Sequence, residues 1–301
     1  MTVTPATPGD LAAIVSRLRA AGCVFAEDEA RLLTDTARSA ADLAAMVDRR
    51  VSGHPLEHVL GWAEFCGLRI AITDGVFVPR RRSAFLVRQA VAVALTAAAP
   101  PAATGTPGQQ GPHHRRTVIV DLCCGSGAIG VAVASALDSA ELHAADIDDA
   151  AVACARKNVA PIGGQVYQGD LYDPLPARLR GRVDVLVVNA PYVPTSEIAL
   201  MPPEARLHEP SIALDGGSDG VDVHRRVAGA ASGWLAHDGT LLIETSDRQA
   251  ATTAAAMTES GLVPVITSDD DFDATVVIGS RGAVPGTPPR ARAAARTRSG
   301  R

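Results

Sequence analysis

The stretch that decides the fold reads Asp121-Leu122-Cys123-Cys124-Gly125-Ser126-Gly127-Ala128-Ile129-Gly130. The run VIVDLCC (118–124) predicts a strand, and Ile129–Leu137 predict a helix after it. Gly125 and Gly127 permit positive φ angles and let the backbone approach a ligand closely. A ligand held by such a turn lies beyond the carboxyl end of the strand, at the switch point of a sheet. The turn alone is ambiguous, because nucleotide-binding loops and purely structural loops both use it.

The alternation of strand and helix continues after this turn. Apolar runs predict strands at ELHAADI (141–147), Gln165–Gln168, VDVLVV (183–188), TLLIETS (240–246) and DATVVIGS (273–280). Helical patterns cover Ala150–Asn158 and Val221–Leu235. Short apolar strands that alternate with helices predict an α/β fold with a parallel, doubly wound sheet.

The chain before the turn has a different pattern. Between residues 10 and 50, apolar residues recur at three- and four-residue spacing, which predicts a small helical unit. The segment PLEHVLGWAEFCGLRIAITDGVFVPRRR (55–82) is rich in aromatic and β-branched residues and contains a turn signal at 73–75, so we expect a hairpin. Phe85–Ala98 return to a helical pattern, and the Pro- and Gly-rich residues 99–116 predict a flexible surface loop.

The composition indicates a cytoplasmic globular protein. Hydrophobic residues make up 47% of the 301 residues, and no apolar run reaches the roughly 18 residues of a membrane span. No signal peptide is visible at the start. The stretch 281–301 holds six arginines and no acid, which leaves residues 1–280 with a net charge of −11. A region this acidic repels polyanions such as nucleic acids. We therefore expect no stable nucleic-acid partner and no membrane.

The cysteines do not indicate a metal site. Cys23, Cys66, Cys123, Cys124 and Cys154 are odd in number and contain no CxxC pair. We expect free thiols in a reducing compartment and no metal, although adjacent Cys123 and Cys124 leave open a metal ligand pair or a strained disulfide.

Acidic residues follow successive predicted strands. Asp146 ends the strand after the glycine turn, where a carboxylate can accept both hydroxyls of a ribose. Asp170 follows the third strand, where it can hold an exocyclic adenine amine. Each could instead be a helix cap or a turn former. With Asp121, they make three acids at three successive strand ends, which favours an adenosine-bearing cofactor.

The fourth strand, VDVLVV (183–188), delivers Asn189-Ala190-Pro191-Tyr192 into a loop. The Asn189 side-chain oxygen and the Ala190 carbonyl can each accept one N–H of a planar NH₂ group, and Tyr192 can stack on it. An amide or aromatic amine nitrogen is a poor nucleophile, so a site for it needs this kind of positioning and electrostatic support. The alternative is a structural loop, with Asn189 as a turn former.

The loop resembles the (N/D)PPY motif of amino-methyltransferases. Together with GWAEFCGLRIAITDGVFVPR (61–80) and HEPSIALDGGSDG (208–220), the chain resembles the release-factor glutamine methyltransferase family (HemK/PrmC) from about residue 10 to 280. The resemblance implies a Rossmann-like sheet, S-adenosylmethionine (SAM) as cofactor, and methylation of the GGQ glutamine of peptide-chain release factors.

The resemblance also implies roles for residues that match the family's motifs. The cofactor residues would be Asp121, Cys123, Gly125, Gly127, Asp146, Ile147, Asp170, Leu171 and Asn189. Asn189, Pro191 and Tyr192 would be catalytic, and Asn189, Ala190, Pro191, Tyr192 and Glu209 would bind the substrate, with Pro210 in the same region.

Three departures from the family pattern indicate a divergent paralogue. Ala190 replaces the first proline of NPPY, and Cys123-Cys124 replace the usual Gly-Thr. After Pro-Arg, the family has a segment with acidic residues and threonine, where this chain reads Pro79-Arg80-Arg81-Arg82-Ser83. The arginine run is either a solvated charged surface or a functional change.

We therefore predict a helical N-terminal substrate-recognition domain (1–60), a β-hairpin link (61–84), a SAM-dependent methyltransferase domain (85–282) and a disordered tail (283–301). Protein-glutamine methylation is the preferred function. An adenine amino-methyltransferase acting on DNA or RNA and a non-catalytic SAM-binding protein are the alternatives.

The tail supplies the first test. Residues 283–301 alternate Ala, Arg, Pro and Thr without an apolar face, so their deletion should leave the melting temperature and the turnover nearly unchanged. Calorimetry of the shortened chain checks this, and a fall of several degrees would mean that the tail docks on the fold.

Overall fold

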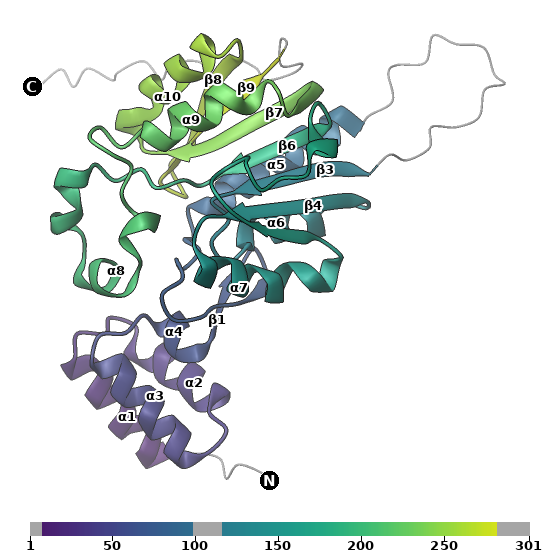
Figure 1. Ribbon diagram of the computed structural model, residues 1–301. Coiled ribbons are helices and arrows are strands. Elements are labelled where there is room, and N and C mark those ends of the chain that lie inside the picture. The colour runs from purple at the N-terminus through teal and green to yellow at the C-terminus, as the bar shows by residue number, and fades with distance from the viewer. Residues whose placement is uncertain (1–7, 99–115, 282–301) are drawn as a thin grey trace, which may run out of the picture.

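The computed structural model describes residues 8–98 and 116–281 (Figure 1). The predicted loop 99–116, apart from Arg116, and the predicted tail 283–301 lie outside the described residues. In the two described ranges, no helix has both the length and the apolar character to cross a membrane.

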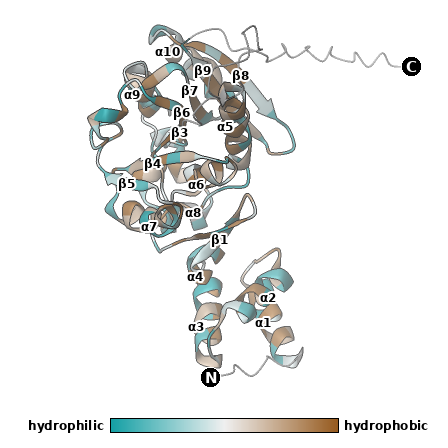
Figure 2. Cartoon of the chain, turned by 90° about the vertical axis from the view of Figure 1, so that its right-hand side faces the viewer, coloured by the Kyte–Doolittle hydropathy of each residue, from teal (hydrophilic) through white to brown (hydrophobic). Residues whose placement is uncertain are grey.

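The N-terminal part is helical, as predicted. It consists of α1 (Pro8–Ala20), α2 (Ala26–Thr36), α3 (Ala40–Val51) and α4 (Leu56–Leu60), which pack around a core of their own with Leu18, Leu33 and Val47 fully buried. The Ser39 hydroxyl caps α3 by accepting the Asp42 backbone N–H at 3.1 Å. The unit lies to one side of the sheet and joins it through α4 and the first strand (Figure 2).

A β-hairpin links this unit to the rest of the chain. Strands β1 (Trp62–Phe65) and β2 (Leu68–Ala71) pair antiparallel through a two-residue turn, Cys66-Gly67. Phe65 and Ile70 are buried in the core of the larger part, so the hairpin belongs to that core. The Asn158 side chain fixes it further, because it both accepts the Ala71 N–H (2.8 Å) and donates to the Ala71 carbonyl (2.9 Å).

The larger part is built on a seven-stranded sheet in the order β5-β4-β3-β6-β7-β9-β8. Its strands are β3 (Thr117–Leu122), β4 (Ala140–Asp146), β5 (Gln165–Gln168), β6 (Val183–Val188), β7 (Leu235–Thr245), β8 (Val263–Asp269) and β9 (Ala274–Ser280). Strands β3 to β7 run parallel, and β9 is antiparallel to β7 and β8. The chain reverses direction across the sheet between β3 and β6, which is the switch point. The Rossmann-like fold class is confirmed.

Helices cover both faces of the sheet (Figure 1). Helices α5 (Ser83–Ala98), α6 (Ala128–Ser135) and α7 (Asp149–Val159) share one core with the hairpin, and α9 (Asp222–Ala231) and α10 (Asp247–Glu259) share another. Successive residues of a strand point to opposite faces, so Ile119 enters the first core and Val120 the second. Burial on both faces explains why β3 and β6 are mostly apolar.

A long segment between β6 and α9 reaches back to the helical unit. It contains α8 (Pro203–His208) and the short 3₁₀ turns η3 (Thr195–Leu200) and η4 (Ser211–Ala213). The Arg50 guanidinium lies 3.2 Å from the Glu204 carboxylate, and the rings of His54 and His208 are 4.5 Å apart. These contacts tie the segment to α3 and to the loop after it.

Three regions differ from the sequence-based expectation. The hairpin turns at residues 66–67, before the turn signal at 73–75 from which it was predicted. The helix predicted over Val221–Leu235 ends at Ala231, because the chain turns at Ser232-Gly233 and Leu235 already begins β7. The pattern analysis assigned neither α10 nor β8. Strand β8 contains Pro264 and is only partly buried, as befits an edge strand, so it lacks the apolar run that identified the central strands.

The hairpin turn supplies a stability prediction. Cys66 and Gly67 have φ angles of 52° and 76°, the two positive values of a type I′ turn, for which Asn-Gly is the preferred pair. Cys66→Asn should raise the free energy of unfolding by about 1 kcal/mol, because asparagine tolerates this conformation better. Urea denaturation followed by circular dichroism measures the change. Gly67→Ala is the matched control and should destabilise the fold. An unchanged or lowered urea midpoint for Cys66→Asn would contradict the assignment of a type I′ turn.

Candidate active site

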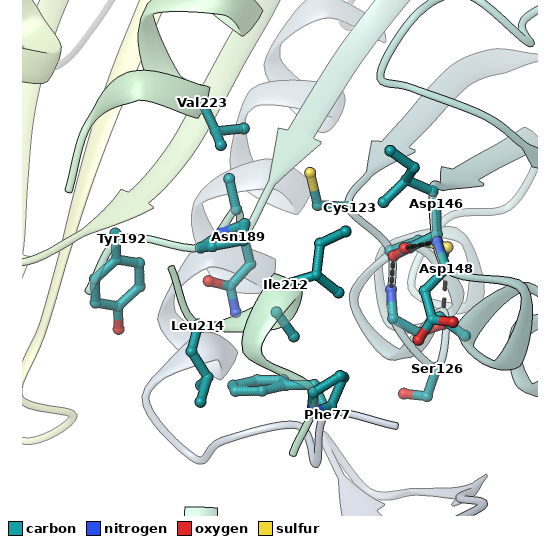
Figure 3. A pocket seen from close by; sticks show the side chains of 18 of the residues that line it. Phe77, Cys123, Ser126, Asp146, Asp148, Asn189, Tyr192, Ile212, Leu214 and Val223 are labelled. Carbon is teal, nitrogen blue, oxygen red and sulfur yellow. Dashed lines mark hydrogen bonds between the residues drawn. The ribbon is translucent and has the colours of Figure 1, made fainter. Parts of the chain in front are cut away.

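A cavity of about 300 Å³ opens at the carboxyl ends of β3, β4 and β6. It brings together most of the residues predicted from the sequence: Cys123, Gly125, Asp146, Ile147, Asp170, Leu171, Asn189, Ala190, Pro191, Tyr192 and Pro210. Asp121, Gly127 and Glu209 do not line it; each lies behind the wall and supports a residue or helix that does. Figure 3 shows Asp146 and Asn189 at opposite ends of the cavity.

The buried side chain of Asp121 supports the loop after β3. This buried carboxylate accepts the Gly130 N–H of α6 at 2.8 Å, and burial raises its pKa to about 7. Gly127 caps α6 with a φ of 78°, and a Cβ there would lie 3.0 Å from the Val159 side chain. Asp121 and Gly127 therefore position the loop.

Asp146 forms the wall of the cavity next to this loop. One oxygen accepts the Gly125 N–H at 2.8 Å and the other accepts the Asp148 N–H at 3.0 Å (Figure 3). Each carboxylate oxygen has a further lone pair, so the group can still accept two hydroxyls. Burial raises the pKa of Asp146, while the two backbone N–H groups oppose that shift by favouring the charged form.

Asp170 lies farther along the cavity and carries an ion pair that the sequence did not predict. Its carboxylate is 2.5 Å from the Arg226 guanidinium of α9, and both residues line the cavity together with Val223 of the same helix. The adjacent Leu171 has a φ of 48°, a left-handed conformation that is unusual for leucine. The Asp170 carboxylate is thus oriented before any ligand arrives.

The loop that follows β6 forms the other end of the cavity. Gln249 of α10 donates to the Tyr192 carbonyl at 2.8 Å. Two glycines of the downstream motif pack against the same residue: a Cβ on Gly216 would lie 2.7 Å from the Tyr192 Cα, and one on Gly220 would lie 2.3 Å from its carbonyl oxygen. Only glycine permits this approach, which fixes the loop although Ala190 replaces a proline.

The arginine run after the hairpin lies partly in the cavity. Arg80 and Arg82 line it, Arg80 is paired with the buried Glu209, and the Nε of Arg82 lies 3.7 Å from the buried Glu244 of β7. Burial raises the pKa of both carboxyls, and the neighbouring guanidiniums oppose the shift. Arg82 is exposed and Arg80 is partly exposed, so the run is a solvated surface that also contacts two buried carboxylates. A functional role of the run stays a prediction.

The cysteines are free thiols, and Cys123 has an unusual backbone. Its φ is 54°, at the position where the family pattern has glycine. Burial raises the thiol pKa of both Cys123 and Cys124, so neither thiol is activated. Among the described residues, no group of histidine, cysteine and acidic side chains has the arrangement of a metal site.

Several site residues were missed by the sequence analysis. They are Phe77, Ser83, Asp148, Ile212, Leu214, Val223, Arg226 and, just behind the wall, Glu244. Asp148 carried a usable signal, because it directly follows a predicted strand, as Asn189 does. The others reach the cavity from segments whose placement depends on the tertiary fold.

Comparisons with known proteins agree with this geometry. Residues 109–217 match the model of the family described as methyltransferase small domain. A release factor glutamine methyltransferase of Geobacter sulfurreducens is 33% identical over 238 residues, which are 78% of this chain and 76% of that protein. The chain belongs to the release factor glutamine methyltransferase family.

Two further similarities add detail. A 4-amino-L-phenylalanine/4-methylamino-L-phenylalanine methyltransferase of Streptomyces pristinaespiralis is 33% identical, over 71% of this chain and 69% of that protein. A methyltransferase structure from Pyrococcus furiosus shares the fold with a TM-score of 0.50 and 14% identity, over 72% of this chain and 90% of the other.

Members of this family are SAM-dependent enzymes, and the cavity fits that cofactor. A Cβ placed on Gly125 would meet no protein atom within 4 Å, so the loop leaves open space beside its backbone. Asp146 and Asp170 offer carboxylates for a ribose and an adenine amine, and Ile147 and Val223 offer apolar contact. SAM is the cofactor of this methyltransferase.

Asp146 is the residue on which cofactor binding should depend most. Loss of two charge-assisted hydrogen bonds, each worth roughly 1.5–3 kcal/mol, predicts that Asp146→Ala weakens SAM affinity about a hundredfold or more. Titration calorimetry measures this, and Cys124→Ser should lose far less. Equal affinities of the wild type and Asp146→Ala would place the ribose elsewhere.

Proposed function

We propose that this enzyme methylates the side-chain amide nitrogen of a protein glutamine, the GGQ glutamine of peptide-chain release factors. The observation that carries the proposal is the loop Asn189 to Tyr192, which opens on the same cavity as Asp146. The similarity to a release factor glutamine methyltransferase of G. sulfurreducens supports this acceptor. A release-factor acceptor implies a cytoplasmic enzyme whose partner is a protein rather than a nucleic acid or a membrane.

The chain's contribution to the reaction is positioning. SAM supplies an electrophilic methyl group when it is bound at the Asp146 end. The Asn189 Oδ1 and the Ala190 carbonyl accept the two N–H groups of the amide, which orients the nitrogen and stabilises the positive charge that builds on it. The rings of Phe77 and Tyr192 line the same end of the cavity and can contact the planar amide.

Proton removal needs no dedicated base. A methylated, positively charged amide nitrogen is a strong acid and releases its proton to water. The buried carboxylates at this end, Glu209 and Glu244, are each engaged by an arginine, which fits a structural role better than that of a free base.

Exposed apolar side chains favour a protein as the acceptor. Val24 and Phe25, between α1 and α2, are 82% and 69% exposed, and Leu200 and Leu207, in the segment after β6, are 82% and 66% exposed. Contiguous exposed apolar patches are typical of protein-binding surfaces. We infer that the helical unit and the α8 segment recognise the body of the substrate protein.

A small aromatic amine is the second candidate acceptor. The S. pristinaespiralis relative acts on such an amine, whose lone pair is delocalised like that of an amide. Arg80 and Arg82 line the cavity and could pair with the carboxylate of an amino acid. Adenine in a nucleic acid fits less well, because the body of the chain is acidic.

Asn189→Ala tests the assignment of the loop. The substitution should leave SAM affinity within a few-fold of wild type, since Asn189 is assigned to the acceptor, and should lower the methyl-transfer rate by roughly 10²–10³. Calorimetry and a single-turnover assay measure the two quantities. Near-full activity would make the loop structural and the mechanism wrong.

The acceptor itself is identified with labelled SAM. We expect label on a purified release factor, and none after the GGQ glutamine is changed to glutamate, because glutamate has no side-chain nitrogen to receive the methyl group. Free 4-amino-L-phenylalanine and an adenine-containing oligonucleotide are assayed in parallel. Label on either of these, with none on any release factor, would contradict the proposed function.

A further inference from the structure

At the acceptor end of the cavity, the side-chain amide of Asn189 contacts the polar side chain of Ser83. Its Nδ2 lies 3.3 Å from the hydroxyl of Ser83, the first residue of α5, and the Ser83 side chain is almost fully buried. Ser83 lines the same cavity as Asn189 and Tyr192. A side-chain amide can be turned by 180°, which exchanges its oxygen and nitrogen, so this contact bears on which atom faces the acceptor.

Ser83 is itself oriented by Glu244. The Ser83 hydroxyl also lowers the pKa of the Glu244 carboxyl, which places the two groups side by side; Glu244 is 1% exposed and has one oxygen without a hydrogen-bond partner. A serine hydroxyl has one proton. A carboxylate accepts but does not donate, so Glu244 favours a Ser83 proton that points toward it and leaves the Ser83 oxygen to accept from Asn189. The 3.3 Å contact has that arrangement, with the nitrogen of Asn189 facing Ser83.

Strand register places Glu244 where this chain of contacts requires it. In the parallel pair β6–β7, Val188 is opposite Ile243, so the next residues along the two strands are Asn189 and Glu244. Arg82, with its Nε 3.7 Å from Glu244, balances the charge of the carboxylate and also faces the ring of Tyr192 at 5.9 Å. The sheet, the start of α5 and the loop after β6 thus meet at one polar cluster.

We propose that Ser83, held by Glu244, is a positioning residue that keeps the Asn189 side-chain oxygen turned toward the acceptor nitrogen. The inference rests on the proposed function, in which that oxygen accepts an N–H of the acceptor. With the amide reversed, an NH₂ group would face the NH₂ group of the acceptor, and no hydrogen bond could form. Ser83 selects the productive orientation without touching the methyl donor.

The chain offers a direct test, because it contains only two asparagines, Asn158 and Asn189. Side-chain ¹⁵N labelling of asparagine therefore gives two NH₂ groups in an NMR spectrum, and Asn189→Asp assigns them by removing one. Ser83→Ala should shift the Asn189 NH₂ signals and speed their exchange with water. The Asn158 signals should not move, since Asn158 is bonded to Ala71 and Ser126.

Matched variants separate hydrogen bonding from packing. Ser83→Thr keeps the hydroxyl and Glu244→Gln keeps an acceptor for it, so both should leave the Asn189 signals near their wild-type positions. Glu244→Ala frees the Ser83 hydroxyl to rotate and should shift them as Ser83→Ala does. Unmoved Asn189 signals in Ser83→Ala would overturn the proposal, whether or not Glu244→Ala folds.

Kinetics give a second readout. Ser83→Ala should lower kcat about tenfold, the effect of one neutral hydrogen bond, with SAM affinity unchanged. In an Asn189→Ala background the same substitution should change kcat less than about twofold, because Ser83 acts through Asn189. If the effects of Ser83→Ala and Asn189→Ala on kcat were fully additive, the proposal would be overturned. A wild-type enzyme that methylates no release factor would instead refute the proposed function, and the NMR result would still decide the role of Ser83.

Discussion

The parallel hydrogen bonding of β4, β3, β6 and β7 is the constraint on which the site depends. Strands that pair in parallel point the same way, so their carboxyl ends lie at one edge of the sheet. In the register of this sheet, Leu122 pairs with both Ala145 and Val188, and Val188 pairs with Ile243. The residues one step beyond these ends are forced together. They include Asp146 and Asn189, which lie far apart in the sequence and close off the two ends of one cavity. Buried apolar contacts on both faces stabilise the sheet that enforces this alignment.

The two ends of the cavity use charge differently. At the cofactor end, carboxylates are fixed by backbone N–H groups or by Arg226, and they keep lone pairs for a ligand. At the acceptor end, the carboxylates are buried beside arginines that also line the cavity, and the groups proposed to contact the acceptor nitrogen are neutral: an amide, a backbone carbonyl and aromatic rings. That division suits the transfer of a methyl group to a poorly nucleophilic nitrogen, in which geometry and hydrogen-bond acceptors assist more than a base does.

The sequence predicted those features that local pattern determines. The central strands, the helical unit, the hairpin and the cofactor and acceptor loops all carry a periodicity or a motif that is readable along the chain. The glycine turn by itself was less informative, since Gly125-Ser126-Gly127-Ala128-Ile129-Gly130 also satisfies the GxGxxG spacing of dinucleotide-binding loops. Contacts that depend on register could not be predicted. Glu244 reads as part of a strand, and Ser83 as the residue after an arginine run, until pairing of β6 with β7 places both beside Asn189.

The central claim is that one cavity holds a ribose at Asp146 and an amide nitrogen at Asn189. A crystal structure of the enzyme with S-adenosylhomocysteine and a release factor tests it most directly. The account predicts the ribose hydroxyls on the Asp146 carboxylate. It also predicts the GGQ amide nitrogen within about 3.2 Å of both the Asn189 Oδ1 and the Ala190 carbonyl oxygen. An acceptor amide bound outside the Asn189 to Tyr192 loop, or a ribose away from Asp146, would contradict it.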